Sequence, residues 1–204
     1  MKSRRPPARL ARLYLVRHGQ TDWAELGRHT SRSQVPLSAA GRRAARRLAG
    51  ALQGVTFSRV WVSPRDRARQ TCVLAGLGRR MAIEPDLVEW DYGDYEGLTS
   101  AEILLRRPGW NLFRHGCPNG ESPAQVSRRA DRLLARLRRQ GGNIALFSHG
   151  HFGRVLAARW VKLPVGAGQR LLLEPASLSI LDHEHQRPDS PVIALWNAGP
   201  VLRR

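Results

Sequence analysis

The sequence of 204 residues contains very little cysteine and no long run of apolar residues. Its two cysteines, Cys72 and Cys117, form no CxxC pair and join no Cys/His cluster with zinc-site spacing. A disulfide framework and a zinc module are therefore excluded, and both cysteines are interpreted as reduced thiols that pack like small apolar groups. No stretch approaches the ~20 apolar residues of a membrane-spanning helix.

The amino-terminal segment lacks the features of a secretory signal. Residues 1–10 are rich in Arg and Pro, and the apolar run over residues 13–16 is too short for a signal-peptide core. We therefore expect a basic flexible leader over residues 1–10, a single domain over residues 11–204, a cytoplasmic location and no membrane partner.

Lysine is nearly absent, although the formal net charge is +18. Only Lys2 and Lys162 occur, and arginine supplies the rest of the positive charge. Two interpretations compete: an anionic partner such as nucleic acid, and a compositional bias that makes arginine the general surface cation. The arginines are spread along the chain, without a dense basic tail or interleaved aromatic residues. This spread favours the bias and predicts no specific nucleic-acid partner, while the positive field still attracts small anionic substrates.

Short apolar segments alternate with amphipathic segments along the chain. The apolar segments predict strands over residues 12–17, 59–62, 81–84, 143–148, 177–182 and 192–196. Apolar residues at helical spacing predict helices over residues 38–52, 64–74, 122–139 and 152–160. Residues 87–122 are rich in Gly, Trp, Tyr and Pro, which is typical of a functional insert, with one short helix near residues 100–106.

This alternation predicts an α/β protein, a three-layer α/β/α sandwich with a mostly parallel central sheet and the loop-rich insert over its active site. In such folds, ligands bind beyond the carboxyl ends of the strands. Arg17-His18 and Ser148-His149 directly follow two predicted strands. We therefore expect both histidines near the same edge of the sheet.

The run Leu15-Val-Arg-His-Gly-Gln-Thr21 carries the first candidate site. The Arg17 guanidinium suits a phosphate because it can donate two parallel hydrogen bonds. Gly19 lets the backbone approach a ligand closely, and the Thr21 hydroxyl is a donor. Taken alone, His18 would more often be a structural histidine at the end of a strand.

Three further segments change that balance. Residues 63–71, SPRDRARQT, place Arg67 early in a predicted helix. Residues 87–97, LVEWDYGDYEG, bring Glu89 into the insert. Residues 147–150, FSHG, place His149 at the end of a predicted strand. In this order, the segments resemble the histidine phosphatase superfamily, in the branch that includes the cofactor-dependent phosphoglycerate mutases. The resemblance covers nearly the whole chain.

The resemblance implies a role for each matching residue. His18 resembles the nucleophile that forms a transient phosphohistidine, and Arg17, Arg67 and His149 resemble the rest of the phosphate pocket. Glu89 resembles the proton donor to the leaving oxygen. These residue types suit phosphoryl transfer, which depends mainly on positioning and fixed positive charge. No metal and no cofactor are expected, because the arginines and the imidazole already supply that charge.

Several nearby residues leave alternatives open. The acidic residues around Glu89 are rivals for its role, namely Asp91, Asp94 and Glu96, and the last of these could brace the loop instead. Arg114-His115-Gly116 repeats the RHG triplet, but it follows no buried strand and is expected at the rim. Two positions depart from the family pattern, Ala24 in place of a small polar residue and Ser31 in place of Gly. Thr30 is still expected to contact phosphate.

The insert resembles a subgroup that contains bacterial acid phosphatases and fungal sedoheptulose-1,7-bisphosphatase, rather than the mutases. Candidate contacts to the substrate are Tyr92, Arg114, Glu121, Gly150, His151 and Arg154. Each of the side chains could equally be a packing or surface residue.

The favoured function is a phosphomonoesterase for small phosphorylated metabolites such as sugar phosphates, active as a monomer or a homodimer. The alternative is a mutase that uses the same phosphohistidine. A mutase must hold two anionic groups and exclude water, whereas the insert carries a mixture of arginines and acidic residues.

Overall fold

A computed structural model describes residues 10–199 of the protein. Its centre is a six-stranded sheet in the order β3-β2-β4-β1-β5-β6. The strands are β1 (Arg12–Arg17), β2 (Phe57–Val62), β3 (Met81–Ile83), β4 (Asn143–Ser148), β5 (Leu178–His183) and β6 (Pro191–Ala198). β1 to β4 pair in parallel, whereas β5 and β6 run antiparallel along one side. The predicted mostly parallel sheet is therefore confirmed; residues 1–9 of the expected leader lie outside the described part.

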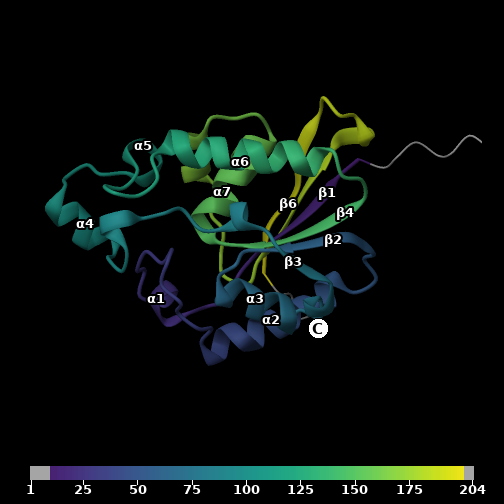
Figure 1. The fold of residues 1–204 in the computed structure, drawn as a ribbon, viewed down its shortest axis with the longest axis horizontal. Helices are drawn as coiled ribbons and strands as arrows, with labels where there is room; N and C mark the ends of the chain where they lie inside the picture. The colour runs from purple at the N-terminus through teal and green to yellow at the C-terminus, as the bar shows by residue number, and fades with distance from the viewer. Residues whose placement is uncertain (1–9, 200–204) are drawn as a thin grey trace, which may run out of the picture.

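Helices cover both faces of this sheet (Figure 1). α6 (Pro123–Arg138) and α7 (Gly150–Trp160) lie on one face, and α2 (Ala39–Leu52) and α3 (Asp66–Leu74) lie on the other. Three shorter helices gather beyond one end of the sheet, namely α1 (Asp22–Glu25), α4 (Ser100–Arg106) and α5 (Leu112–His115). The three-layer α/β/α architecture is the one that the sequence predicted.

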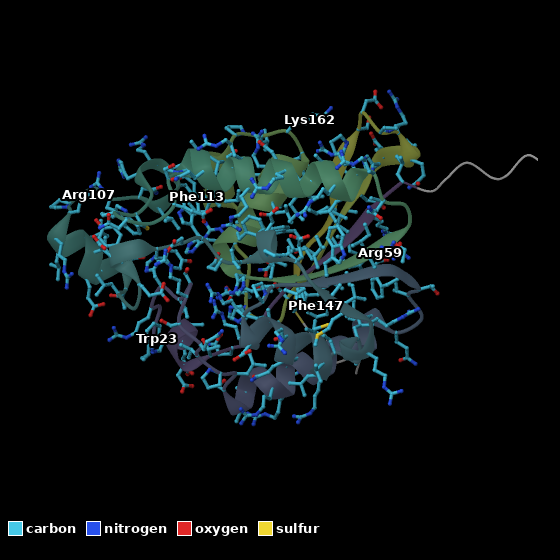
Figure 2. The ribbon with its side chains drawn as sticks, viewed as in Figure 1. Trp23, Arg59, Arg107, Phe113, Phe147 and Lys162 are labelled. Carbon is cyan, nitrogen blue, oxygen red and sulfur yellow. The ribbon has the colours of Figure 1, made fainter. Side chains whose placement is uncertain are left out.

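Apolar residues on each side of the sheet form two separate cores. One joins α6, α7 and the insert, with Trp90 and Trp160 as its largest fully buried side chains. The other lies between the sheet and the helices α2 and α3, where Phe147 is fully buried (Figure 2). The amphipathic helix α6 begins at a capping box between Ser122 and Gln125, with Pro123 in its first turn.

The two thiols are free and buried, as expected. Burial raises the pKa of both Cys72 and Cys117 to about 12, so neither is a reactive thiolate. Within residues 10–199, no helix is both long and apolar enough to cross a bilayer.

Some element boundaries differ from the prediction. The strand β2 starts at Phe57 rather than at residue 59, because the buried Phe57 is followed by two exposed residues that hide the strand period. The helix α7 starts at Gly150 rather than at residue 152, since glycine is a poor helix former and masks the first turn. The short helices α1 and α5 were not predicted; four residues are too few for a helical period.

The pairing of β1 with β4 sets the position of the candidate site. Arg17 lies opposite Ser148 in the parallel register, so the next residues, His18 and His149, emerge at the same edge of the sheet. The backbone N–H of His18 also donates to the Ser148 carbonyl at 3.0 Å. This edge faces the end of the molecule where α1, α4 and α5 gather (Figure 1).

The turn after His18 packs directly on α2 through two glycines. A Cβ on Gly19 would lie 2.6 Å from the Gly41 carbonyl oxygen, and a Cβ on Gly41 would lie 2.1 Å from the Gln20 carbonyl oxygen. Gly19 is therefore required for helix packing, whereas the sequence had suggested a close approach to a ligand.

We expect Gly41→Ala to lower the free energy of unfolding by roughly 1–3 kcal/mol, because the new methyl group must displace the backbone of the His18 turn. Gly50→Ala in the same helix is the matched control, since a Cβ there meets nothing within 4 Å. This control should be stabilising by roughly 0.5–1 kcal/mol. Urea unfolding measures both, and equal effects of the two substitutions would contradict the packing role.

Candidate active site

His18 has one nitrogen fixed by the backbone and one nitrogen free. Its Nδ1 lies 2.7 Å from the Gly19 carbonyl oxygen, and a carbonyl can only accept, so Nδ1 carries the proton. The other nitrogen, Nε2, then has a lone pair, and it makes no hydrogen bond within residues 10–199. Burial, followed by the charges of Arg67 and Arg17, lowers the pKa of His18 well below its ordinary value. The ring is therefore neutral and nucleophilic at Nε2.

His149 packs edge-on against His18, with ring centroids 5.2 Å apart. It is fully buried, and its Nε2 lies 2.7 Å from the Ser63 hydroxyl oxygen. That hydroxyl accepts from the Arg65 backbone N–H at 3.3 Å and can donate its own proton to the imidazole. In that arrangement Nδ1 of His149 carries a proton, and this buried atom has no partner within the described residues.

Two arginines flank the histidine pair. The Arg67 guanidinium is fully buried and donates to the carbonyls of Thr30, Ser31 and Ser33 at 2.9–3.2 Å. The Arg17 guanidinium donates to the Leu173 carbonyl. The Nε atom of each arginine is buried without a partner in the part of the chain that the structure describes.

The histidines and arginines together form a buried cluster that favours an anion. Burial lowers the pKa of both Arg17 and Arg67, and their charges help keep His18 neutral. Three buried donors, the Nε atoms of the arginines and Nδ1 of His149, have no acceptor within residues 10–199. Unsatisfied buried donors are costly, and an anion with several acceptor oxygens is the group that would satisfy them.

The Glu89 side chain lies beside this cluster, at the amino-terminal end of α7. Its Oε1 accepts from the backbone N–H groups of Trp90 at 2.9 Å and Phe152 at 2.7 Å. Its Oε2 accepts from the His151 N–H at 3.1 Å. Because two of these donors belong to the first turn of α7, the helix terminus holds the carboxylate in place.

A cavity of about 200 Å³ opens in front of His18. Its wall is formed by Arg17, His18, Thr21, Ala24, Gly27, Arg28, His29, Thr30, Glu89, Tyr92, Ser100, Gly150, His151, Arg154, Leu172 and Leu173. Arg67 and His149 do not line this cavity; both are fully buried beside His18. The arrangement places the neutral His18 ring, the Arg17 guanidinium and the Glu89 carboxylate on the wall of one small cavity.

Comparison with known proteins identifies the family of this site. The model of the histidine phosphatase superfamily (branch 1) matches residues 13–198. The chain belongs to this superfamily. The family that the motifs predicted is therefore confirmed.

Three similar proteins show the range of this family around the chain. An acid phosphatase of Mycobacterium tuberculosis is 46% identical over 179 residues, which cover 85% of this chain and 87% of that protein. Sedoheptulose 1,7-bisphosphatase of Saccharomyces cerevisiae is 34% identical over 193 residues, which cover 78% of this chain and 70% of that protein. The solved structure of an open reading frame product of Mycobacterium tuberculosis has a TM-score of 0.86 and 40% identity, covering 94% of this chain and 99% of that one.

Most substrate contacts expected for this histidine phosphatase lie on the cavity wall. Thr21, Thr30, Tyr92, Gly150 and His151 all line it. The Thr21 hydroxyl also accepts from the Ala24 N–H at 3.1 Å as the N-cap of α1. Gly19 does not line the cavity.

Arg114 and Glu121 are not on the cavity wall. Arg114 is exposed on α5, where it borders a separate hollow, because the neighbouring Phe113 takes the inward face of that helix. Glu121 forms an ion pair with Arg129 at 2.6 Å and accepts from the Asp91 backbone N–H at 3.0 Å. Both placements correct the suggestion of direct substrate contact, and Glu121 instead braces the segment that carries Glu89.

Two of the ambiguous residues in the insert have structural roles. Glu96 accepts from the backbone N–H groups of Ser31 and Ser33, which confirms its bracing of the loop. His115 is exposed on α5 and accepts from the Asn111 N–H at 2.9 Å. The repeated RHG triplet does not line the cavity in front of His18.

The sequence did not single out Arg28, His29 and Ser100, which also line the cavity. These residues carry no motif, and long-range contacts bring them there, such as the bridge between Arg28 and Thr99. Within residues 10–199, no group of three or more His, Cys, Asp or Glu side chains is arranged to hold a metal ion.

The histidines of this site should make the protein sensitive to mild acid. Burial is the main cause that lowers the pKa values of His18, His29, His149 and His151 below 6.5. The unfolded chain therefore binds more protons than the folded chain as the pH falls below about 6.5, and stability present above that pH is lost.

We expect the free energy of unfolding to fall between pH 7.5 and pH 5.5 by up to about 1.4 kcal/mol per pH unit for each of these histidines. Urea unfolding in phosphate-free buffer at several pH values measures this loss. An unchanged free energy over this range would contradict the neutral state of the cluster.

Proposed function

We propose that this chain is a metal-independent phosphomonoesterase that hydrolyses small phosphorylated metabolites, such as sugar phosphates, through a phosphohistidine on Nε2 of His18. The supporting observation is the cluster of three buried donors that have no partner within residues 10–199, beside a neutral His18 whose Nε2 makes no hydrogen bond to those residues. The family and its named phosphatases agree with this chemistry.

In the first step, the lone pair of His18 Nε2 attacks phosphorus. The bond between nitrogen and phosphorus forms while the bond to the ester oxygen breaks. The guanidiniums of Arg17 and Arg67 and the imidazole of His149 bind the phosphoryl oxygens, where the charge is spread in the transition state. The Nδ1–H bond to Gly19 holds the attacking ring in the correct tautomer.

Glu89 moves the proton in both steps. In the first step, the protonated form of Glu89 gives its proton to the leaving oxygen as the bond to phosphorus breaks, so that the alcohol departs neutral. After the alcohol leaves, the Glu89 carboxylate takes a proton from water as that water attacks phosphorus. The nitrogen–phosphorus bond breaks, inorganic phosphate leaves, and Glu89 is protonated again.

Hydrolysis fits the site better than phosphoryl isomerisation. A mutase needs a second cationic group for an additional anion, and Arg114 of the insert borders a separate hollow instead. Arg28 and Arg154 line the cavity and donate to backbone carbonyls at 2.6–2.9 Å, and neither has a buried donor left without a partner within residues 10–199, unlike Arg17 and Arg67. Because the site offers no dedicated position for a second anion among the described residues, water can reach the phosphohistidine and hydrolyse it.

We expect His18→Ala to lower turnover of p-nitrophenyl phosphate by roughly three orders of magnitude or more, because the change removes the nitrogen that attacks phosphorus in the proposed first step. The control His115→Ala removes a histidine of the same triplet motif, outside the cavity, and should keep its activity. Rapid quench with a labelled substrate should trap an acid-labile phosphate on His18 alone, and EDTA should leave turnover unchanged. A label on His115, or a loss with EDTA that magnesium restores, would overturn the proposal.

We expect Glu89→Gln to lower kcat for glycerol 1-phosphate by roughly a hundredfold or more, because an alkoxide leaves only with a proton. p-Nitrophenyl phosphate should lose much less, since nitrophenolate leaves without one. Asp94→Asn changes a neighbouring carboxylate of the insert that binds Asn119 instead, and it should have little effect on either substrate. Equal losses on both substrates would argue against a proton-donor role for Glu89.

A further inference from the structure

His151 is held in one tautomer by Tyr92. The Tyr92 hydroxyl oxygen lies 2.6 Å from Nδ1 of His151, and Tyr92 is almost fully buried. This is the only hydrogen bond of that hydroxyl within the described residues, so donation by the phenol satisfies both groups. Burial raises the pKa of Tyr92 well above its ordinary value, which keeps the phenol protonated. Nδ1 of His151 is thus the acceptor, and Nε2 carries the proton.

His29 is held in the opposite tautomer by the backbone. Its Nδ1 lies 2.8 Å from the Leu98 carbonyl oxygen, which can only accept. Nδ1 of His29 therefore carries the proton, and Nε2 presents a lone pair. The ring is fixed by edge-on contacts with Tyr92 and Trp110, at centroid distances of 4.7 Å and 5.6 Å.

The two imidazoles lie parallel to each other on the wall of the cavity in front of His18. Their planes differ by 8°, and their centroids are 5.9 Å apart. Both rings line the cavity in front of His18 and also a second cavity of about 280 Å³ beside it, toward α4 and α5. Neither Nε2 atom has a hydrogen bond within residues 10–199, and neither is among the side-chain atoms sealed from solvent there.

Both rings are also kept uncharged. Burial is the main cause that lowers the pKa of each, and the nearby Arg154 charge adds to this for His151. The hydrogen bond to the Leu98 carbonyl, and after it the charges of Glu89 and Glu96, raise the pKa of His29, but burial outweighs them. A donor on His151 and an acceptor on His29 are therefore carried by two neighbouring, parallel rings of the cavity wall.

We propose that His29 and His151 bind hydroxyl groups of the leaving alcohol and so select phosphate esters of polyols over phosphate esters of simple alkyl alcohols. A hydroxyl both donates and accepts, so neighbouring hydroxyls can satisfy a fixed donor and a fixed acceptor together. An alkyl chain leaves both nitrogens unpaired once water is displaced, and sites built to bind a hydroxyl reject analogues without it. This inference rests on the proposed phosphomonoesterase function, and Tyr92 acts in it as a positioning residue.

The first test compares glycerol 1-phosphate with n-propyl phosphate, which has the same carbon chain without the two free hydroxyls. We expect kcat/KM to be at least about tenfold higher for the polyol ester in the unmodified protein. His151→Phe and His29→Phe should each reduce that ratio to within about threefold, because the phenyl ring keeps the packing and removes the polar nitrogen. His115→Phe makes the same change outside both cavities and should preserve the ratio.

The variant Tyr92→Phe distinguishes the positioning role of Tyr92 from the direct contacts of the two histidines with the substrate. Without the phenol, His151 can exchange tautomers, so the ratio should fall although both imidazoles remain. Since kcat/KM ratios between two substrates of one variant cancel any loss of folded enzyme, partial instability does not hide the result. A ratio near one in the unmodified protein, or a ratio preserved in both histidine variants, would overturn the proposal.

Nitrogen-15 NMR of the imidazoles tests the tautomers without any activity assay. At pH 7 we expect His151 as the Nε2–H form and His29 as the Nδ1–H form, with the signals assigned by the two phenylalanine variants. The same tautomer on both rings would overturn the inference even if the enzyme is active. Absence of hydrolysis for every phosphomonoester would instead defeat the proposed function, while opposite tautomers would still support the donor–acceptor pair.

Discussion

The site depends on positive charge that is buried without a matching acidic side chain at each guanidinium. Arg67 is fully buried, and backbone carbonyls of Thr30, Ser31 and Ser33 bind it in place of a carboxylate. Carbonyl dipoles hold the guanidinium in position but do not neutralise it. Burial is the main cause that lowers the pKa values of the two adjacent imidazoles, and the remaining charge adds to it, so the rings are neutral and the pocket is complementary to an anion.

Glu89 complements this charge from a separate element. Its oxygens accept from backbone N–H groups in the first turn of α7, while the backbone behind it is held by Arg129 and Glu121. The carboxylate is thus fixed by main-chain donors on one side and by a braced segment on the other. In the proposed reaction, a carboxyl group that is held so firmly needs little reorganisation when charge develops on the leaving oxygen.

Much of the fold and the reacting centre could be predicted from the sequence, because both depend on local patterns. The buried runs of β1 and β4 are continuous, and each is followed directly by a histidine of the site. The outer part of the site could not be predicted in the same way. His29 owes its place to a carbonyl near residue 98 and to stacking on His151, which are contacts between distant segments. The prediction that Arg114 contacts the substrate was wrong because neighbouring residues of a helix face different sides, and Phe113 takes the inward side on α5.

The Arg67 side chain connects the proposed phosphate position to the loop that carries His29, two regions that are far apart in the sequence. Its guanidinium grips the carbonyls of residues 30–33, and the same loop carries His29 into the cavity. A ligand that accepts a hydrogen bond from this guanidinium therefore also changes the strength of the hydrogen bonds between Arg67 and that loop. Under the proposed function, occupancy of the phosphate position and occupancy of the alcohol position then influence each other equally in both directions, by thermodynamic linkage. The proposal thus implies that the two parts of a substrate are recognised cooperatively, through one buried cation.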